Sequence, residues 1–471
     1  MNNNKTKIVA TIGPNIESVS KINVLKKNGM SIARLNGSHN TLKWHADLIK
    51  KIKHNFEGIP VLFDIPGKKI RTVQLENEPS FKKNDEIIFT TYTKYSGKDK
   101  VAINNNKLHL LLKKKDVIYA DDGTLSFKVE RIIKKDIHCV CMSNGKLKSA
   151  KGINVPHINL GGDKLSIKEK KFINFAIKHG VNFIGISFVE SANYIKRIRN
   201  IIKNKKLKII AKIENQGGLD NMEAIIGEAD GIMIDRGDLS TETKTESIAI
   251  FQKKIIHECN RLSKPVIVAT EMINSMIENP FPTKAEVTDI SNAILDGASA
   301  IMLSGETAVG AYPFKSVEIM QKISETVEHS QPVNYDNKQE GIPAAIGSSI
   351  VSITKRLKIS KIIIITSSGF AARTIASLML KQPIIAITNI YENSVCFNLY
   401  RGVRGIYLNV NFQRKNLEHI PICLEKLWKK RIICNKDMIL VTGVGYPNKG
   451  NRMNMIQTHY VKDLQKTFNW K

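Results

Sequence analysis

Eight short apolar segments that alternate with helix-length segments constrain the fold of this chain more than any other feature. Each is rich in Val, Ile and Ala and leads into a polar residue and a turn. Near-continuous apolar strands that alternate with helices indicate a parallel sheet covered on both faces, and eight such strands close a (β/α)8 barrel. The segments span residues 7–13, 31–37, 61–65, 183–188, 208–214, 231–238, 265–270 and 300–305.

Two intervals break this alternation and predict two further domains. The third strand ends at residue 65 and the fourth begins at residue 183, a gap far longer than an ordinary strand-to-helix connection. The intervening residues alternate in polarity and carry turn signals, as a small β-domain would. After about residue 330, new apolar runs such as KIIIITSSG and MILVTGVG alternate with helical stretches.

The chain should therefore fold as an α/β protein with three domains. We expect a catalytic (β/α)8 TIM barrel formed by residues 1–67 and 161–330, and a small inserted β-barrel domain at residues 68–160 that acts as a lid. Residues 331–471 should form a C-terminal α/β domain with a mainly parallel sheet and a regulatory or oligomerisation role.

Polar side chains gather at the carboxyl ends of the predicted strands, where the active sites of such barrels lie. Glu214 and Asp238 follow adjacent strands and are candidates for a Mg²⁺ site, because that ion is held by one or two carboxylates plus water and substrate oxygens. Lys212 lies two residues before Glu214 and so faces the same side of its strand. A metal, a lysine and arginines around an anion suit phosphoryl transfer. The complete set is Arg34, Asn36, Asp64, Lys212, Glu214, Arg236, Asp238, Thr270 and Ser304.

Each of these residues also has an ordinary structural interpretation. Lys212 and Glu214 together would make an interior ion pair that supports the barrel. Thr270 at a strand-to-helix junction would be a normal helix cap, and His39 a turn residue. The combination with Arg34 and Asp238 favours the catalytic interpretation.

The net charge of +29 favours anionic partners, because a positive field concentrates anions near the surface. Charge alone does not separate nucleic acid, anionic membranes and acidic metabolites. Only 6% of the residues are aromatic, so no stacking platform for single-stranded nucleic acid is evident. We expect most of the charge to be solvated surface.

The cysteines and the N-terminal segment indicate a cytoplasmic protein. No two cysteines have the C-x-x-C spacing, and Cys139 and Cys141 share one face of a predicted strand. Buried free thiols in a reducing compartment are therefore expected in place of disulfides or a metal site. No signal-length apolar stretch opens the sequence and no run of 18 apolar residues occurs, so we predict no membrane association.

Seven motifs of the predicted barrel resemble pyruvate kinase: KIVATIGP, ARLNGSH, AKIENQGGLDN, GIMIDRGDL, ATEMINSM, PTKAEVTDISNAILDG and IMLSGETAVGAYP. The inserted segment fits through DDGTLSFKV and KGINVP, and the C-terminal part fits more loosely through TSSG and LYRGV. Members of this family transfer the phosphoryl group of phosphoenolpyruvate to ADP, giving pyruvate and ATP in glycolysis. The resemblance implies these molecules as partners, a cytoplasmic homotetramer, and no specific nucleic acid.

The same resemblance implies roles for individual residues. Lys212 would stabilise the phosphoryl group in transit and Arg34 would meet the substrate phosphate. The backbone of Gly237 and Asp238 and the side chain of Thr270 would hold the substrate carboxylate. Thr270 and Ser304 would support the water network that protonates the enolate, with the donor itself left open. The metal ligands for Mg²⁺ (or Mn²⁺) would be Glu214 and Asp238, and the nucleotide-binding residues Asn36, His39, Arg71 and Lys151.

One position bears on the requirement for K⁺. In many relatives a K⁺ ion is held by residues matching Asn36, Ser38, Asp64 and the carbonyl of Ile65, and such enzymes carry Glu where this chain has Lys69. Relatives with Lys there resemble a K⁺-independent class, in which an ammonium supplies the charge. Ile65 and Pro66, in place of the usual Thr-Lys, point the same way. We therefore hypothesise that Lys69 replaces K⁺.

Three residues depart from the family pattern. Gly37 follows the asparagine of the second strand where Phe is usual, Asp235 stands where a small residue is usual, and Ser240 stands where Gly is usual. We expect these changes to affect turnover or metal affinity, while the predicted metal ligands and the catalytic lysine are intact.

A hydroxyl-rich loop in the third domain resembles the effector-phosphate site of regulated members. It consists of Thr366, Ser367, Ser368 and Gly369, and it precedes a predicted helix whose N–H groups would favour an anion. Ala371 stands where a hydroxyl residue is common, and a simple helix cap is the alternative.

Two further functions remain open from the sequence. One is another Mg²⁺-dependent enzyme that acts on phosphoenolpyruvate or a keto acid on the same barrel. The other is a catalytically silent regulatory or RNA-binding homologue, against which the intact Lys212, Glu214 and Asp238 argue.

Overall fold

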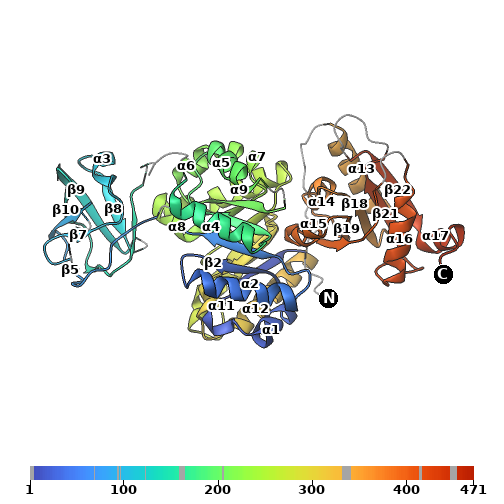
Figure 1. Cartoon of the computed structure of the whole chain (residues 1–471), viewed down its shortest axis with the longest axis horizontal. Coiled ribbons are helices and arrows are strands. Elements are labelled where there is room, and N and C mark those ends of the chain that lie inside the picture. The colour runs from blue at the N-terminus through green and yellow to red at the C-terminus, as the bar shows by residue number, and fades with distance from the viewer. Residues whose placement is uncertain are drawn as a thin grey trace.

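A computed structural model of the chain shows three bodies in a row, with the barrel in the middle (Figure 1). It describes residues 5–67, 69–92, 95, 97–121, 123–156, 158, 165–203, 206–330, 341–412, 416–445 and 453–471. Lys68, and residues 159–164 and 331–340 at the predicted domain boundaries, lie outside this description.

Eight strands form a closed barrel in which every neighbouring pair is parallel. They are β1 (Lys7–Thr11), β2 (Met30–Asn36), β3 (Val61–Ile65), β13 (Phe183–Ile186), β14 (Lys208–Ile213), β15 (Gly231–Asp235), β16 (Val266–Ala269) and β17 (Ala300–Leu303). Their apolar side chains fill the barrel interior on one side and contact the outer helices on the other. The predicted barrel is confirmed.

The sixth predicted strand is too long by three residues. The strand β15 ends at Asp235, and Arg236 begins α8 (Arg236–Glu242). The prediction for residues 236–238 as strand was therefore wrong, because the chain turns into a helix as soon as it leaves the barrel. Asp238 consequently lies in the first turn of α8, where a carboxylate interacts favourably with the helix dipole.

Amphipathic helices surround the barrel and start at local sequence signals. Ser166 and Thr283 each form a capping box with the glutamate three residues later, at the starts of α4 and α10. The outer helices are α1 (Val19–Lys27), α2 (Leu42–Asn55), α4 (Ile167–Lys178), α5 (Ala192–Ile202), α6 (Gln216–Asp220), α7 (Met222–Glu228), α9 (Ile248–Arg261), α10 (Lys284–Leu295), α11 (Gly305–Ala308) and α12 (Pro313–Ser330).

The segment between β3 and β13 forms a small β-structure. Its seven-stranded sheet runs β4-β12-β8-β9-β10-β6-β7, and a bridge between Thr72 and Ile103 joins the two ends. Phe127 packs edge-on against Phe81 and Phe89 in its core, and Cys139 and Cys141 are buried. The elements are β4 (Ile70–Arg71), β5 (Ser80–Phe81), β6 (Glu86–Thr90), β7 (Val101–Ala102), α3 (Leu108–Leu111), β8 (Val117–Ala120), β9 (Leu125–Ile133), β10 (Asp136–Cys141), β11 (Gly145–Lys146) and β12 (Gly152–Asn154).

The C-terminal part is an α/β structure with a five-stranded sheet in the order β20-β19-β18-β21-β22. Four strands are parallel and β22 is antiparallel to β21, as the mainly parallel prediction requires. Arg401 docks it on the barrel by donating to the carbonyls of Ile294 and Ala298, both at 3.2 Å. The elements are α13 (Ile342–Arg356), β18 (Lys361–Ile365), α14 (Phe370–Ala376), β19 (Ile384–Thr388), α15 (Tyr391–Cys396), β20 (Val403–Tyr407), α16 (His419–Lys429), β21 (Met438–Gly443), β22 (Met455–Tyr460) and α17 (Val461–Thr467).

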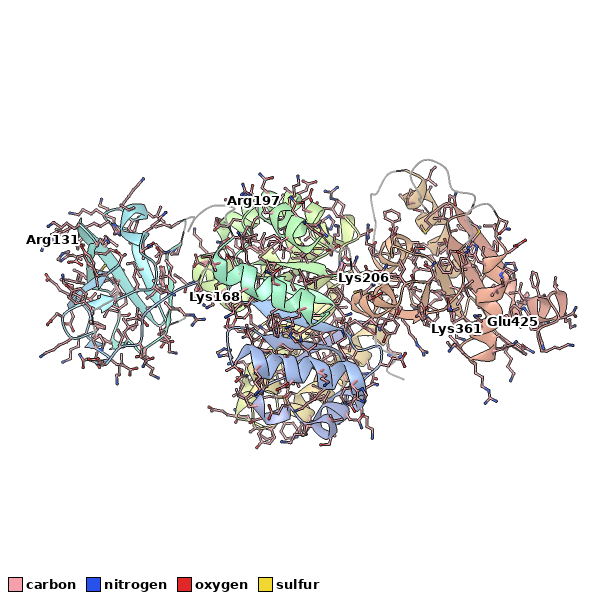
Figure 2. All side chains as sticks on the ribbon, in the orientation of Figure 1. Arg131, Lys168, Arg197, Lys206, Lys361 and Glu425 are labelled. Atoms are coloured by element: carbon pink, nitrogen blue, oxygen red, sulfur yellow. The ribbon has the colours of Figure 1, made fainter. Side chains whose placement is uncertain are left out.

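Charged side chains are spread over all three bodies. Arg131 projects from the inserted part, Lys168 and Arg197 from the barrel and Lys361 from the C-terminal part (Figure 2). Within the part of the chain that the structure describes, every helix is too short or too polar to span a bilayer.

Candidate active site

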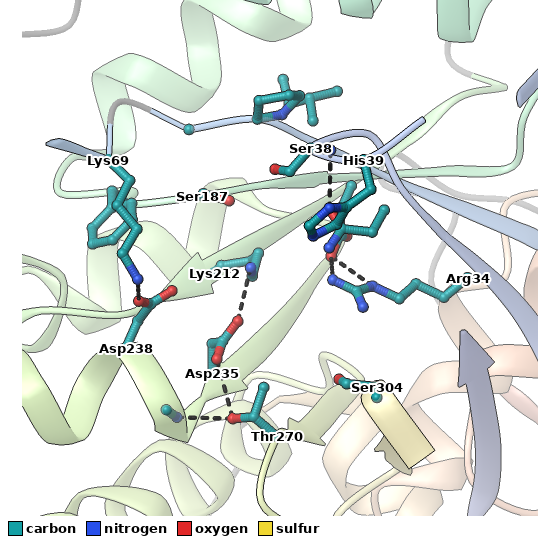
Figure 3. A pocket seen from close by; sticks show the side chains of 18 of the residues that line it. Arg34, Ser38, His39, Lys69, Ser187, Lys212, Asp235, Asp238, Thr270 and Ser304 are labelled. Carbon is teal, nitrogen blue, oxygen red and sulfur yellow. Dashed lines mark hydrogen bonds and ion pairs between the residues drawn. The ribbon is translucent and has the colours of Figure 1, made fainter. Parts of the chain in front are cut away.

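A cavity of about 820 Å³ opens at the carboxyl ends of the barrel strands (Figure 3). Asn104 and Ala150 of the inserted part also line it. The structure brings together thirteen of the predicted site residues there: Arg34, Asn36, Ser38, His39, Asp64, Ile65, Lys69, Arg71, Lys212, Gly237, Asp238, Thr270 and Ser304.

Lys212 lies at the centre of this cavity, between two buried carboxylates. Its Nζ is 2.6 Å from Oε1 of Glu214 and 2.9 Å from Oδ2 of Asp235. Lys212 is on β14 and Glu214 directly follows that strand, close together as the spacing predicts, and Asp235 comes from the adjacent strand β15. Glu214 is completely buried behind the cavity wall.

Burial and charge pairing set the protonation of this group. Burial would lower the pKa of Lys212, but Asp235 and Glu214 raise it well above its ordinary value. Burial would also raise the pKa of Asp235, but attraction to Lys212 lowers it to about 2. For Glu214, burial and repulsion by Asp238 and Asp235 outweigh Lys212 and raise the pKa to about 8. The lysine therefore stays protonated, and the ionised form of Glu214 is the least favourable charge in the group.

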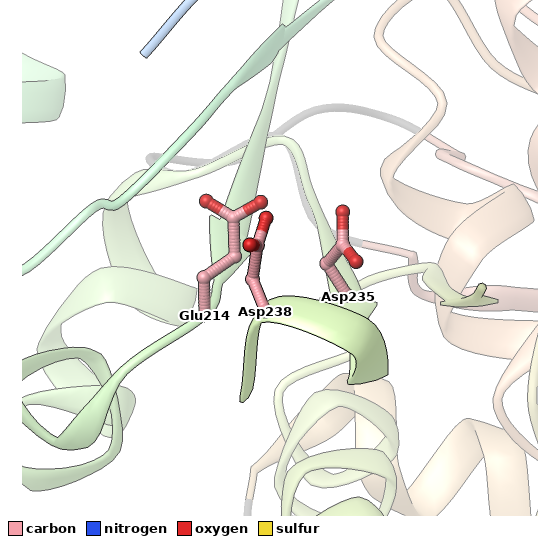
Figure 4. Close-up of side chains that lie close together, drawn as sticks. All are labelled: Glu214, Asp235 and Asp238. Atoms are coloured by element: carbon pink, nitrogen blue, oxygen red, sulfur yellow. The ribbon is translucent and has the colours of Figure 1, made fainter. Parts of the chain in front are cut away.

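Three carboxylates lie together where a hard divalent cation would bind, and the predicted ligands Glu214 and Asp238 are two of them, whereas both oxygens of the third, Asp235, contact Lys212 and Thr270. Glu214, Asp235 and Asp238 each offer an oxygen within 4.8 Å of the others (Figure 4). Among the described residues, none donates a well-directed hydrogen bond to the buried Glu214 Oε1, although the Lys212 ammonium is near, so its charge is under-compensated. Carboxylate oxygens are the ligands that Mg²⁺ and Mn²⁺ prefer.

Arg34 is held rigidly on the opposite side of the cavity. Its Nε and Nη2 donate to Oδ2 of Asp64 at 2.9 and 2.7 Å, and its Nη1 donates to Thr11 at 3.0 Å. Both Arg34 and Asp64 are buried. A guanidinium fixed in this way presents its remaining N–H groups in a defined direction, which suits binding of a phosphate.

Thr270 adopts a strained backbone conformation that places its hydroxyl in the cavity. Its φ is 65°, in the left-handed region that β-branched residues avoid. In this conformation its Oγ1 accepts from the backbone N–H of Gly237 at 2.8 Å and lies 3.1 Å from Oδ1 of Asp235. Such strain at a cavity is a common feature of functional sites.

Lys69 reaches Asp238 and not the predicted K⁺ ligands. Its ammonium forms an ion pair with Oδ1 of Asp238. Gly152 makes room for this side chain, because a Cβ at position 152 would lie only 2.7 Å from Lys69 Cε. The cation thus lies beside a predicted metal ligand, while the charge of Asp64 is met by Arg34.

The remaining predicted residues differ in their surroundings. Asn36 accepts from the backbone of Ser38 at 3.1 Å, and Arg71 donates to the carbonyl of Ala150 at 3.0 Å. Burial, Arg71 and Arg34 together lower the pKa of His39. The hydroxyl of Ser304 is buried and has no hydrogen-bond partner within the described residues, so it is available to a ligand or water.

Two predicted groups lie away from the cavity lining. Lys151 forms an ion pair with Asp121 at 2.6 Å. In the Thr366–Gly369 loop, the Thr366 hydroxyl accepts from the backbone of Gly369 at 3.1 Å and Ser367 donates to Asn389 at 3.3 Å. The residue that precedes α14 is Gly369, and this helix has no side-chain cap hydrogen bond among the described residues, so the effector site and the helix cap both stay predictions.

Sequence reasoning missed several residues of this region. Lys168, on α4, lines the cavity but lies in a helix with no local signal for function. Glu242, at the end of α8, is buried against Asn154 of the inserted part, whose Nδ2 donates to it at 2.6 Å. Asp235 was noted as a departure, but its contacts with Lys212 and Thr270 follow only from the three-dimensional arrangement.

Comparisons with known proteins give a consistent result. Residues 3–317 match the family model "Pyruvate kinase, barrel domain", and residues 344–459 match "Pyruvate kinase, alpha/beta domain". A pyruvate kinase of Thermococcus litoralis is 37% identical over 88% of this chain and 90% of the relative. One of Bacillus licheniformis is 35% identical over 98% of this chain and 81% of the relative. A crystal structure of a pyruvate kinase from Cryptosporidium parvum superposes with a TM-score of 0.88 at 31% identity, covering 98% of this chain and 96% of that one.

Proposed function

The chain belongs to the pyruvate kinase family, and from this premise we propose how its cavity transfers the phosphoryl group of phosphoenolpyruvate to ADP. The observation that carries the proposal is the buried ammonium of Lys212 between Glu214 and Asp235 at the base of the cavity. A permanently protonated lysine there neutralises the charge of a phosphoryl group in transit, and phosphoryl transfer depends mainly on positioning and charge neutralisation.

The substrate is held at both ends. Arg34, fixed by Asp64 and Thr11, binds the phosphate. The backbone at Gly237 and Asp238, in the first turn of α8, and the Thr270 hydroxyl bind the carboxylate, which replaces the hydrogen bond from the Gly237 N–H to Thr270 Oγ1. Ser304, whose hydroxyl has no partner in the part of the chain that the structure describes, supports the water that protonates the enolate.

Glu214 and Asp238 hold the divalent cation, Mg²⁺ or Mn²⁺. When bound, this ion supplies positive charge to the oxygens of the substrate and of the transferring group. Asn36, His39, Arg71 and Lys151 contact the nucleotide. Arg71 and its neighbour Ala150 come from the inserted part at the cavity rim, which supports a lid role for residues 68–160 over the barrel of residues 1–67 and 161–330.

The enzyme works without K⁺, because Lys69 places an ammonium at the cavity. The region of Asn36, Ser38, Asp64 and Ile65 then needs no monovalent ion. We assign residues 331–471 to oligomerisation and regulation, with a cytoplasmic homotetramer as the assembly. The Thr366–Gly369 loop is the position at which a phosphate effector would bind.

A coupled assay tests the proposal. Purified protein with phosphoenolpyruvate, ADP and Mg²⁺ should form ATP and pyruvate in equal amounts, measured separately by luciferase and by lactate dehydrogenase. Lys212→Met should lower kcat by at least about a thousandfold, since it removes the charge at the transferring group. The matched control is Lys253→Met, on the exposed side of α9, where the ammonium pairs with Asp296 and activity should be unchanged. No ATP from the wild-type protein, or full activity in Lys212→Met, would refute the assignment.

A further inference from the structure

Asp235 places a carboxylate in the cavity at a position where the family usually has a small residue. It ends β15 directly before α8, and only 6% of its surface is exposed. Both carboxylate oxygens are engaged: Oδ2 lies 2.9 Å from Nζ of Lys212, and Oδ1 accepts from Oγ1 of Thr270 at 3.1 Å. Figure 3 shows this chain of contacts from Lys212 through Asp235 to Thr270.

The contact with Thr270 removes the donor that a substrate carboxylate needs. The Thr270 oxygen already accepts from the N–H of Gly237, so its single proton is the only donor it offers. That proton has two acceptors within the chain, Asp235 and the carbonyl of Ala269 at 2.6 Å. An incoming carboxylate must displace one of them.

The contact of Asp235 with Lys212 also opposes substrate binding. Its ammonium is shared between Glu214 and Asp235, both of which are buried. A substrate anion that approaches Lys212 meets a carboxylate already at 2.9 Å, and like charges in a poorly solvated site repel strongly. The Asp235 side chain therefore uses the same two partners as an anionic substrate.

We propose that Asp235 is a specificity-determining residue that competes with the substrate carboxylate for the Thr270 hydroxyl and with the phosphoryl group for the Lys212 ammonium, and so weakens phosphoenolpyruvate binding. The inference rests on the proposed function, which places the substrate carboxylate at Thr270 and Gly237. It concerns the substrate groups at Thr270 and Lys212, whereas Arg34, which we assign to the substrate phosphate, pairs with Asp64.

A different role for Asp235 would produce the opposite kinetics. If the carboxylate only positioned Lys212, its removal would let the ammonium move toward Glu214 and would lower kcat. If it competes with the substrate, its removal leaves kcat nearly intact and lowers KM. The division between kcat and KM therefore separates competition from positioning.

The experiment compares Asp235→Ala and Asp235→Asn with the wild-type enzyme. Asp235→Asn keeps the size of the side chain but removes its charge, and so also serves if the alanine variant folds poorly. Asp220→Ala, which removes the same charge from the exposed helix α6, is the matched control for long-range electrostatics. We expect at least about a tenfold lower KM for phosphoenolpyruvate in both Asp235 variants, with kcat within about threefold.

Two small anions test the same idea without turnover. Oxalate carries two adjoining carboxylates, and inorganic phosphate represents the other half of the substrate. By calorimetry in the presence of Mg²⁺, both Asp235 variants should bind oxalate at least about tenfold more tightly than the wild type does, and phosphate more tightly as well, because the Lys212 ammonium is released from Asp235.

The outcomes separate this inference from the proposed function. An inactive wild-type enzyme would refute the proposed function, and the oxalate titration would still decide whether Asp235 opposes a carboxylate. Unchanged KM and oxalate affinity, or a fall in kcat with KM unchanged, would overturn the inference. An effect seen in Asp235→Ala alone would overturn it as well, because bulk and not charge would then be the cause.

Discussion

Replacing Glu242 by Gln should stabilise the folded protein, and the gain should increase with pH. Glu242 is buried at the end of α8 and accepts a hydrogen bond from Asn154 in the strand β12 of the inserted part. Burial, which outweighs the hydrogen bond from Asn154, and repulsion by Asp238 raise the pKa of Glu242 to about 7. The folded state therefore disfavours the ionised carboxylate.

The magnitude follows from linkage between protonation and folding. Below the unfolded pKa of 4.5 the group is protonated in both states and has no effect. Between pH 4.5 and about pH 7 the Glu242 carboxyl ionises mainly in the unfolded state, and this favours unfolding. Above about pH 7 it is ionised in both states, and the destabilisation of the folded state is constant. At about 1.4 kcal/mol per pH unit, this destabilisation is about 1.4 kcal/mol at pH 5.5 and about 3.5 kcal/mol at pH 8.5.

A neutral amide removes this penalty and keeps a similar shape. Asn154 Oδ1 is buried and has no hydrogen-bond partner within the described residues, so the new amide N–H has an acceptor. Urea unfolding followed by circular dichroism, at pH 5.5 and 8.5, should show that the stabilisation by Glu242→Gln rises by about 2 kcal/mol between the two values. The matched control is Glu246→Gln on the exposed turn after α8, which should show no such rise. Equal stabilisation at both pH values would refute the reasoning, because the buried charge would then not be the cause.

Three further predictions concern the cavity and the thiols. Lys69→Glu should make turnover K⁺-dependent, with initial rates in tetramethylammonium buffer at least about tenfold below those in K⁺ buffer; equal rates in both would contradict the role of Lys69. Gly152→Ala should produce part of the same dependence, because the added Cβ would lie 2.7 Å from Lys69 Cε and displace its ammonium from Asp238. In the folded protein, an aromatic disulfide reagent should quickly modify one thiol, that of Cys434. The other five cysteines are buried, and burial raises the pKa of a thiol such as that of Cys139 to about 12. Fast reaction of more than one thiol would show that the core opens.

The barrel could be predicted because each strand carries its own signal. An uninterrupted apolar run such as residues 300–303 is buried on both faces and pairs with strands whose sequences look alike. The end of β15 could not be predicted in the same way. The apolar run and the following RGD motif have no local signal that separates a strand residue from the first turn of a helix, and the strand ends three residues earlier than predicted, at Asp235.

The candidate site was predictable only where it depends on strand spacing. Lys212 and Glu214 lie two residues apart, so their proximity follows from the strand alone. The pair of Lys69 and Asp238 joins segments 169 positions apart in the sequence, and Glu242 meets Asn154 across 88 positions. Such contacts depend on how the inserted part sits against the barrel, which local sequence does not specify.

The charges of the cavity explain why opposite substitutions should have opposite effects. Arg34, Lys69 and Lys212 pair with four carboxylates, namely Asp64, Asp238, Glu214 and Asp235. An anionic substrate that approaches these three cations therefore binds by exchanging partners with the carboxylates. Asp235→Asn removes a carboxylate that is not one of the two proposed metal ligands, and so releases a cation for the substrate. Lys212→Met removes a cation instead, and the buried carboxylates that it leaves unpaired repel the substrate. The high net charge of the surface attracts anions to the molecule, but this internal exchange determines how tightly one is held.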